Sequence, residues 1–166
     1  MPTVQAEVLV PVRPALAFAV SQTHGEVRYR WDPFVREQHF LARAAEPGKG
    51  VQTFTRQRFG LSMISEYVSY SPPTNVGMKM VQGPWFFDLF GGGWRFTPTD
   101  DEGRTRVTWR YNFRCRPSFL RPIAHPLGRW LLGREIRRRI DGYAAGCSDE
   151  VVLAEAERAI ARRDER

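Results

Sequence analysis

The 166-residue sequence has few residues of the kinds that build covalent or metal-bound sites, because it contains only two cysteines and three histidines. Cys115 and Cys147 form no close pair and have no metal-ligand spacing, so we expect both to be small buried hydrophobic residues. Three scattered histidines support no metal site, and we expect no cofactor. The sequence also lacks a Gly-x-Ser-x-Gly elbow and a cysteine in a convincing His–acid context, which argues against nucleophilic catalysis.

Long hydrophobic runs are absent as well. The longest apolar runs fall far short of the roughly 18 residues that a membrane span needs. The apolar stretch over residues 15–20 is approached through Pro11 and Pro14, with Arg13 as the only early basic residue, which is unlike a signal peptide. We therefore expect a cytoplasmic protein.

The length and composition are those of one soluble domain. Hydrophobic residues make up 42% of the chain and charged residues 26%, which favours neither disorder nor membrane insertion. We expect a single domain over residues 1–161. A charged, disordered tail should follow over residues 162–166, where nothing apolar remains to bury. The sequence leaves the oligomeric state open.

Lysine is scarce, and the positive charge comes mainly from arginine. The formal net charge is +7, although the chain has only Lys49 and Lys79 as lysines. Eleven arginines lie between Gly103 and Ile140, against Glu135 alone. Such a surface is either a solvated arginine-rich face or a site of contact with an acidic membrane or an acidic protein.

The first hundred or so residues have the pattern of one strand, two short helices and a series of strands. Residues 4–10 alternate with period two, as in a strand. Pro14 suits the first turn of a short helix, and a second short helix must end before Pro33. Six strands joined by short turns then predict an antiparallel meander over residues 35–42, 51–59, 61–70, 76–82, 86–98 and 104–116.

The last strand has the clearest alternation. Val107, Trp109, Tyr111 and Phe113 share one face, and the other face is basic and polar. Trp94 and Phe96 repeat this in the preceding strand. Specific nucleic-acid binding is therefore not expected, since single-strand platforms place aromatic residues among the basic ones on the exposed face.

Residues 127–160 have the pattern of one long helix. An apolar stripe with steps of three and four residues follows one face, and its members are Leu132, Ile136, Ile140, Tyr143, Cys147 and Val151. Arg137 and Arg139 fall at the borders of the opposite, water-facing side. A single helix is narrow compared with a seven-stranded sheet. The surplus apolar surface must either pack on itself or line a pocket, and such pockets carry a few placed polar groups.

This order of elements, with several local motifs, resembles the START/Bet v 1-like superfamily, also called SRPBCC, and looks closest to its polyketide cyclase/dehydratase-like members. The matching motifs are Val8-Leu9-Val10-Pro11 followed by Phe18, Trp31-Asp32-Pro33, Gly83-Pro84 before residues 90–94, and residues 105–113. The resemblance covers about residues 4–151. It implies an α+β helix-grip fold, in which a curved seven-stranded antiparallel sheet wraps around a long C-terminal helix, with an elongated apolar cavity between them.

Three hypotheses for function follow. The first is binding or carriage of a hydrophobic small molecule, lipid-like or polyketide-like, without catalysis. The second is a polyketide aromatase/cyclase or dehydratase, for which His39 and Glu66 are the candidate general bases. The third is an interaction module that uses the arginine-rich face. The expected ligand-binding residues are Trp31, Phe54, Trp94, Phe96, Trp109, Tyr111, Phe113, Ile136, Ile140 and Tyr143.

Glycines occur inside a predicted strand and inside the predicted long helix, where they are unfavourable. Residues 91–93 are all glycine inside a predicted strand, where glycine is costly, so we expect a bulge or a sharp bend there. Close approach of the backbone to a ligand is the alternative. Gly133 lies within the helix stripe, where it costs about 1 kcal/mol relative to alanine, and we expect it to make room for a strand or a ligand.

Overall fold

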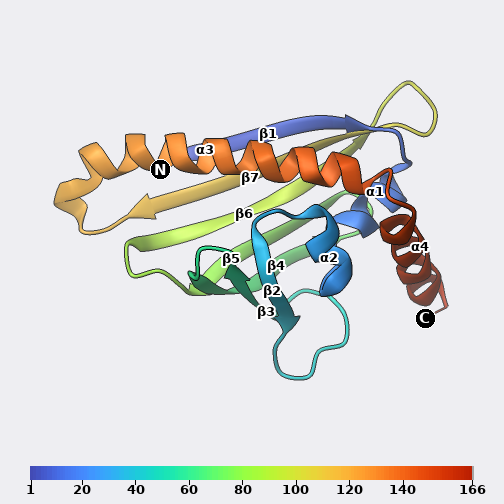
Figure 1. Cartoon of the computed structure of the whole chain (residues 1–166), viewed down its shortest axis with the longest axis horizontal. Helices are drawn as coiled ribbons and strands as arrows, with labels where there is room; N and C mark the ends of the chain where they lie inside the picture. Colours follow the sequence, from blue (N-terminus) through green and yellow to red (C-terminus); the bar gives the residue numbers. More distant parts are fainter. Residues whose placement is uncertain (166) are drawn as a thin grey trace.

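The chain folds into an antiparallel sheet that curls beside one long helix (Figure 1). The computed structural model describes residues 1–165. The strands are β1 (Thr3–Val10), β2 (Val35–Phe40), β3 (Gln52–Gln57), β4 (Ser62–Ser71), β5 (Asn75–Gln82), β6 (Phe87–Pro98) and β7 (Thr105–Cys115). The helices are α1 (Pro14–Ser21), α2 (Glu26–Trp31), the 3-10 turn η1 (Ser118–Leu120), α3 (Arg121–Gly146) and α4 (Glu150–Asp164).

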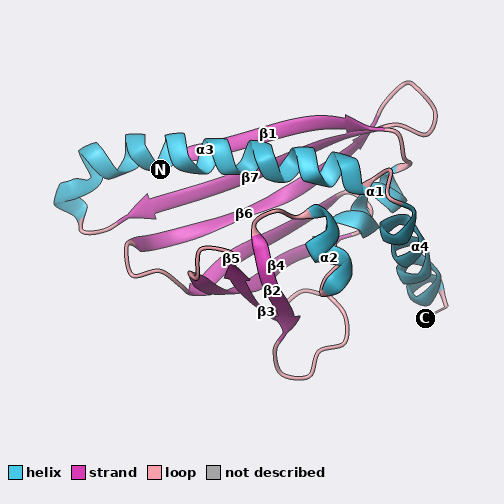
Figure 2. Cartoon of the chain, viewed as in Figure 1, coloured by secondary structure: helices cyan, strands magenta, loops and turns pink. Residues whose placement is uncertain are grey.

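The seven strands form one sheet in the order β1-β7-β6-β5-β4-β3-β2, with antiparallel pairing throughout. The predicted meander and the predicted α+β helix-grip fold are therefore confirmed. Helix α3 runs along β1 and β7, and the short helices α1 and α2 lie on the same side of the sheet (Figure 2). None of the helices in the described chain is long and apolar enough to cross a membrane.

The predicted single C-terminal helix is wrong, because the chain forms two helices there. Helix α3 ends at Gly146, and Asp149 caps α4 by accepting hydrogen bonds from the backbone N–H groups of Val151 and Val152. The break changes the phase of the apolar stripe, so Val151 is exposed and Val152 is buried. Helix α4 packs on α1 (Figure 1). Residues 162–164, which we expected in the tail, are helical, and residue 166 lies outside the described residues.

The core between the sheet and α3 is built from aromatic rings. Trp94 and Trp109 stack with ring centroids 3.7 Å apart, and the Tyr143 ring meets Trp31 edge-on at 5.6 Å. The Tyr143 hydroxyl donates a hydrogen bond of 2.7 Å to the carbonyl oxygen of Ala17, which ties α3 to α1. Ile136 and Ile140 of the α3 stripe are buried in the same core, and Leu132 is partly buried. Both cysteines are buried and unpaired. The predicted burial of the cysteines is confirmed.

The three strand glycines mark a place where the neighbouring strands come unusually close. A Cβ atom on Gly92 would overlap the carbonyl oxygen of Arg110, and one on Gly93 would overlap that of Val76. The pairing runs through these glycines without a register shift, which occurs instead between Phe87 and Leu89. The expected bulge is therefore not at the glycines, and their role is the close approach of strands within a curled sheet.

Candidate functional site

A cavity of about 110 Å³ lies between the inner face of the sheet and the segment that joins α1 to α2. Its apolar lining comes mainly from β4, β5 and β6, and includes Met63, Val76, Met78, Met80, Phe90 and the three strand glycines. Its polar lining comes mainly from the α1–α2 segment and from β2, β3 and β4, and includes Ser21, Gln22, Thr23, Arg28, Gln38, Thr55, Ser65 and Tyr67. Exposed His24 is part of the lining, so the cavity reaches the surface beside this residue.

Three of the ten predicted ligand-binding residues line this cavity: Trp94, Trp109 and Tyr111. Six others are buried but belong to the packed core outside the lining, namely Trp31, Phe96, Phe113, Ile136, Ile140 and Tyr143. Phe54 lies on the outer face of β3, where its ring meets the exposed ring of His39. The aromatic core therefore uses most of the surface that the sequence suggested for a ligand.

The two candidate catalysts, His39 and Glu66, lie outside the cavity. In β2 the residues that line the cavity are Gln38 and Phe40, so the alternation of the strand turns His39 outward. There its Nδ1 lies 3.6 Å from Oε1 of Glu37. In β4 the lining residues are odd-numbered, so Glu66 points to the other face and pairs with Lys79 at 3.3 Å. Neither side chain lines this cavity.

A buried ionic network stands at one wall of the cavity. Arg139 of α3 donates two hydrogen bonds to the Asp32 carboxylate, from Nε at 3.1 Å and from Nη2 at 2.7 Å. Arg28 of α2 donates a third, from its own Nε at 2.9 Å, and the backbone N–H of Phe34 donates a fourth at 3.1 Å. Asp32 is completely buried, and both arginines are buried as well. The network therefore joins α2, α3 and the start of β2 around one carboxylate.

The charges in this network are stable at neutral pH. Burial alone would raise the pKa of Asp32, but Arg139 and Arg28 hold it below its ordinary value, so the carboxylate stays ionised. Burial raises the pKa of the Tyr67 and Tyr111 hydroxyls, which keeps them neutral and able to donate. The cavity lining contains both guanidinium groups but neither Asp32 nor Glu135, whose carboxylate also interacts with Arg139.

The space above Trp109 and Tyr111, two of the expected ligand-binding residues, is occupied by Arg139. The guanidinium carbon lies 4.4 Å from the centre of the Trp109 ring, and Nη1 donates a hydrogen bond of 2.7 Å to the Tyr111 hydroxyl. The open space is displaced toward β4 and β5. At about 110 Å³ this cavity is well below the roughly 300–1,000 Å³ of pockets for larger ligands.

Sequence reasoning missed the ionic network, although the spacing contained two indications of it. Arg139 is three residues after Ile136 and four before Tyr143, which places it on the buried face of the helix rather than at its border. Arg28 and Asp32 are four residues apart, the spacing of an ion pair on one helical face. Their burial depends on the packing of α2 against α3, which no local pattern discloses.

A curled antiparallel sheet with a long C-terminal helix packed along it defines the helix-grip class, the fold of the START/SRPBCC superfamily. The chain belongs to the family described as polyketide cyclase/dehydrase and lipid transport, whose model matches residues 1–146. The resemblance inferred from the sequence motifs is thereby confirmed. A search of the curated proteins found no match.

Solved structures share this fold at low sequence identity. The protein TTHA0849 from Thermus thermophilus is 18% identical, with a TM-score of 0.71 over 92% of this chain and 98% of its own. A START superfamily protein from Mycobacterium smegmatis is 14% identical, with a TM-score of 0.73 over 88% and 97%. The Zhui aromatase/cyclase from Streptomyces sp. R1128 is 18% identical, with a TM-score of 0.65 over 96% and 95%. At these identities the likeness concerns the fold.

Proposed function

We propose that this protein binds a small hydrophobic molecule that carries a hydrogen-bond acceptor or an anionic group. The observation that supports this proposal is the composition of the cavity, where methionine and phenylalanine side chains face a wall that holds two buried arginines. The family description, which includes lipid transport, agrees with an apolar ligand.

The acceptor group of the ligand would meet Arg28. The hydrogen bonds of Arg28 use Nε, toward Asp32, and Nη1, toward the carbonyl oxygen of Ser21 at 2.7 Å. Among the described residues no partner is found for Nη2, and the side chain lines the cavity. A charge-assisted hydrogen bond from this nitrogen would orient the polar end of the ligand, while Met63, Met78 and Phe90 would cover its apolar end.

Calorimetry with benzoate and benzene tests the proposal, because the two probes differ only in the carboxylate and a single ring suits a cavity of about 110 Å³. We expect benzoate to bind more tightly, and Met78→Trp to abolish the binding by filling the cavity. Val81→Trp is the matched control on the same strand, since Val81 is exposed and lies outside the lining. Equal binding to both variants would place the probe elsewhere, and no binding of either probe to the parent protein would contradict the proposal.

A polyketide aromatase/cyclase or dehydratase is the second candidate, and one observation favours it. His24 lies at the cavity opening with its ring 4.5 Å from that of Phe40, so it could exchange protons with a bound substrate. Turnover of a linear polyketide mimic should then fall by about 10²-fold or more in His24→Gln. His39→Gln is the control on the outer face. Equal turnover in His24→Gln and the parent protein would remove this candidate.

A further inference from the structure

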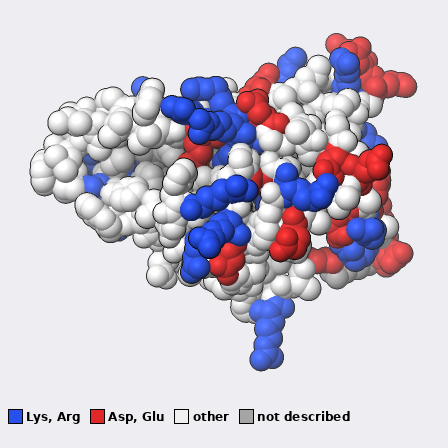
Figure 3. All heavy atoms as spheres, viewed as in Figure 1, with Lys and Arg blue, Asp and Glu red and all other residues white. Residues whose placement is uncertain are grey.

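One end of the molecule carries an exposed apolar surface that the cavity does not explain. On α3 the side chains of Ile123, Leu127, Trp130 and Leu131 follow one another at helical spacing, and each is at least half exposed. Phe119 of η1 is 78% exposed and Trp85, in the connection before β6, is 72% exposed. We call these six residues the apolar tip. The corresponding end of the molecule is nearly free of charged side chains on the face shown in Figure 3.

The packing of α3 does not require these apolar residues. The sheet is covered by the opposite side of the helix, where Gly128 lies against Phe113, and Gly133 lies near Val4. The first half of α3 is therefore apolar toward the sheet and also toward solvent. Because soluble proteins rarely expose large contiguous apolar patches, such a surface marks a site of interaction.

Arginines border the apolar tip. Residues 85–90 and 113–138 contain seven arginines and two carboxylates, and Arg114 and Arg121 both pair with one of these, Asp88. No ion pair is found in the described chain for Arg129, Arg134, Arg137 or Arg138. This border has a strong excess of positive charge, so the partner must be anionic where it meets the arginines.

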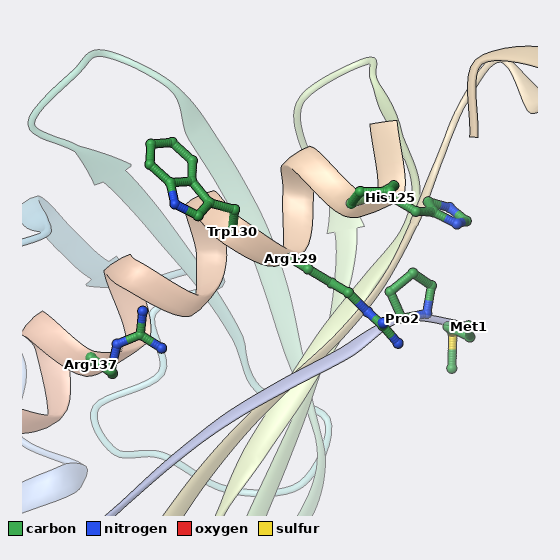
Figure 4. Close-up of a pocket in the computed structure, with 7 residues that line it drawn as sticks. Met1, Pro2, His125, Arg129, Trp130 and Arg137 are labelled. Atoms are coloured by element: carbon green, nitrogen blue, oxygen red, sulfur yellow. The ribbon is translucent and has the colours of Figure 1, made fainter. Parts of the chain in front are cut away.

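Two of these arginines share an open pocket of about 740 Å³ beside α3. Arg129 reaches from the helix toward Pro2 and the start of β1, and Arg137 follows two turns further along (Figure 4). Trp130 also contributes to this lining, so apolar and cationic groups meet at its edge. Guanidinium groups bind phosphate oxygens by paired hydrogen bonds.

We propose that the apolar tip docks on an anionic phospholipid bilayer, with Arg129 and Arg137 binding lipid phosphate groups. The tip suits a bilayer because its apolar side chains are at least half exposed and are bordered by arginines that have no ion pair within residues 1–165. Helices that lie in the membrane interface combine an apolar face with arginines and tryptophan in this way, and tryptophan rings favour the headgroup level. The proposal is independent of the ligand proposed above.

Sedimentation with lipid vesicles tests the docking surface. Vesicles of phosphatidylcholine mixed with phosphatidylglycerol should bind the protein, and phosphatidylcholine alone should not. Arg129→Gln and Arg137→Gln should each weaken binding about fivefold, and the double variant Ile123→Ser/Leu127→Ser should abolish it. Arg95→Gln and Val151→Ser are matched controls, because both residues are exposed and lie outside the tip and its border. Higher salt should weaken the binding through screening.

The results of these experiments distinguish membrane docking from other roles of the apolar tip. Equal binding to both kinds of vesicle, or unchanged binding by the serine variant, would overturn the proposal. A dimer that forms without lipid and is lost in Leu127→Ser would assign the tip to a second copy of the chain. All tip variants should keep the benzoate affinity of the parent protein, because no tip residue lines the cavity.

Discussion

Asp32 connects parts of the chain that lie more than a hundred residues apart, since its partners Arg28 and Arg139 belong to α2 and α3. A buried carboxylate with two arginines is costly to desolvate, and the geometry offsets that cost through four hydrogen bonds. The network joins α2 to α3, and it holds the Arg139 guanidinium over the Trp109 ring.

Replacement of Asp32 should therefore be severely destabilising. Asp32→Asn removes the carboxylate that pairs with two buried arginines, and we expect a loss of about 3–5 kcal/mol in the free energy of unfolding, measured with urea. The control is Glu157→Gln, which breaks the exposed ion pair with Arg13 and should cost at most about 1 kcal/mol. Similar midpoints for both variants would show that the Asp32 network adds no stability.

Cys147 supplies a pH-dependent prediction. Burial raises the pKa of its thiol to about 12, well above the unfolded value of about 8.5. The folded state therefore holds this proton more tightly, and the resulting stability is full below about pH 8.5 and is lost as the pH rises toward 12. In a Cys115→Ser background, iodoacetamide at about pH 9, just above the unfolded pKa, should modify Cys147 only after denaturant is added. Rapid modification of the folded protein would contradict this.

Among the secondary-structure elements, glycines set how closely α3 approaches α2. A Cβ atom on Gly142 would overlap the carbonyl oxygen of Trp31, and one on Gly146 would lie 2.8 Å from the Trp31 Cβ. Gly133 is different, because a Cβ atom there would meet only Arg137 at 3.6 Å and Val4 at 4.0 Å. The expectation that Gly133 makes room for a strand or a ligand is therefore wrong.

A pair of alanine substitutions follows from this contrast. Gly142→Ala should destabilise the protein by about 1–3 kcal/mol, because α3 must move away from α2. Gly133→Ala should stabilise it by up to about 1 kcal/mol, because alanine favours the helix and meets no close neighbour. Thermal unfolding of the two variants and the parent protein measures whether each substitution lowers or raises the stability. A stabilised Gly142→Ala variant would refute the proposed contact.

At the scale of the whole molecule, one helix stabilises the fold without contributing to the cavity. Helix α4 buries Val152, Ala156 and Ile160 and packs on α1, but none of its residues lines the cavity. We expect Ile160→Ala to lower the free energy of unfolding by about 2 kcal/mol or more. Its affinity for benzoate should equal that of the parent protein, and a large change in affinity would show that α4 controls the cavity.

Local sequence patterns were enough to define most of the elements, because the causes of these elements are local. Alternation of residues 107–113 defined a strand with one aromatic face, Pro14 and Pro33 bounded the short helices, and the stripe from Leu132 to Cys147 identified the face of α3 that packs on the sheet. These patterns, with motifs such as Trp31-Asp32-Pro33, were sufficient to predict the fold and the superfamily.

The site could be found only in the folded chain, because its residues meet through packing between distant segments. The strand β2 alternates weakly, so the outward direction of His39 depended on its pairing with β3. The helix stripe continued past Gly146, and the end of α3 was set by the Asp149 cap and by the contact of α4 with α1. Arg139 fills the hollow over Trp109 because Asp32 lies opposite it, and that neighbour is set by the whole fold.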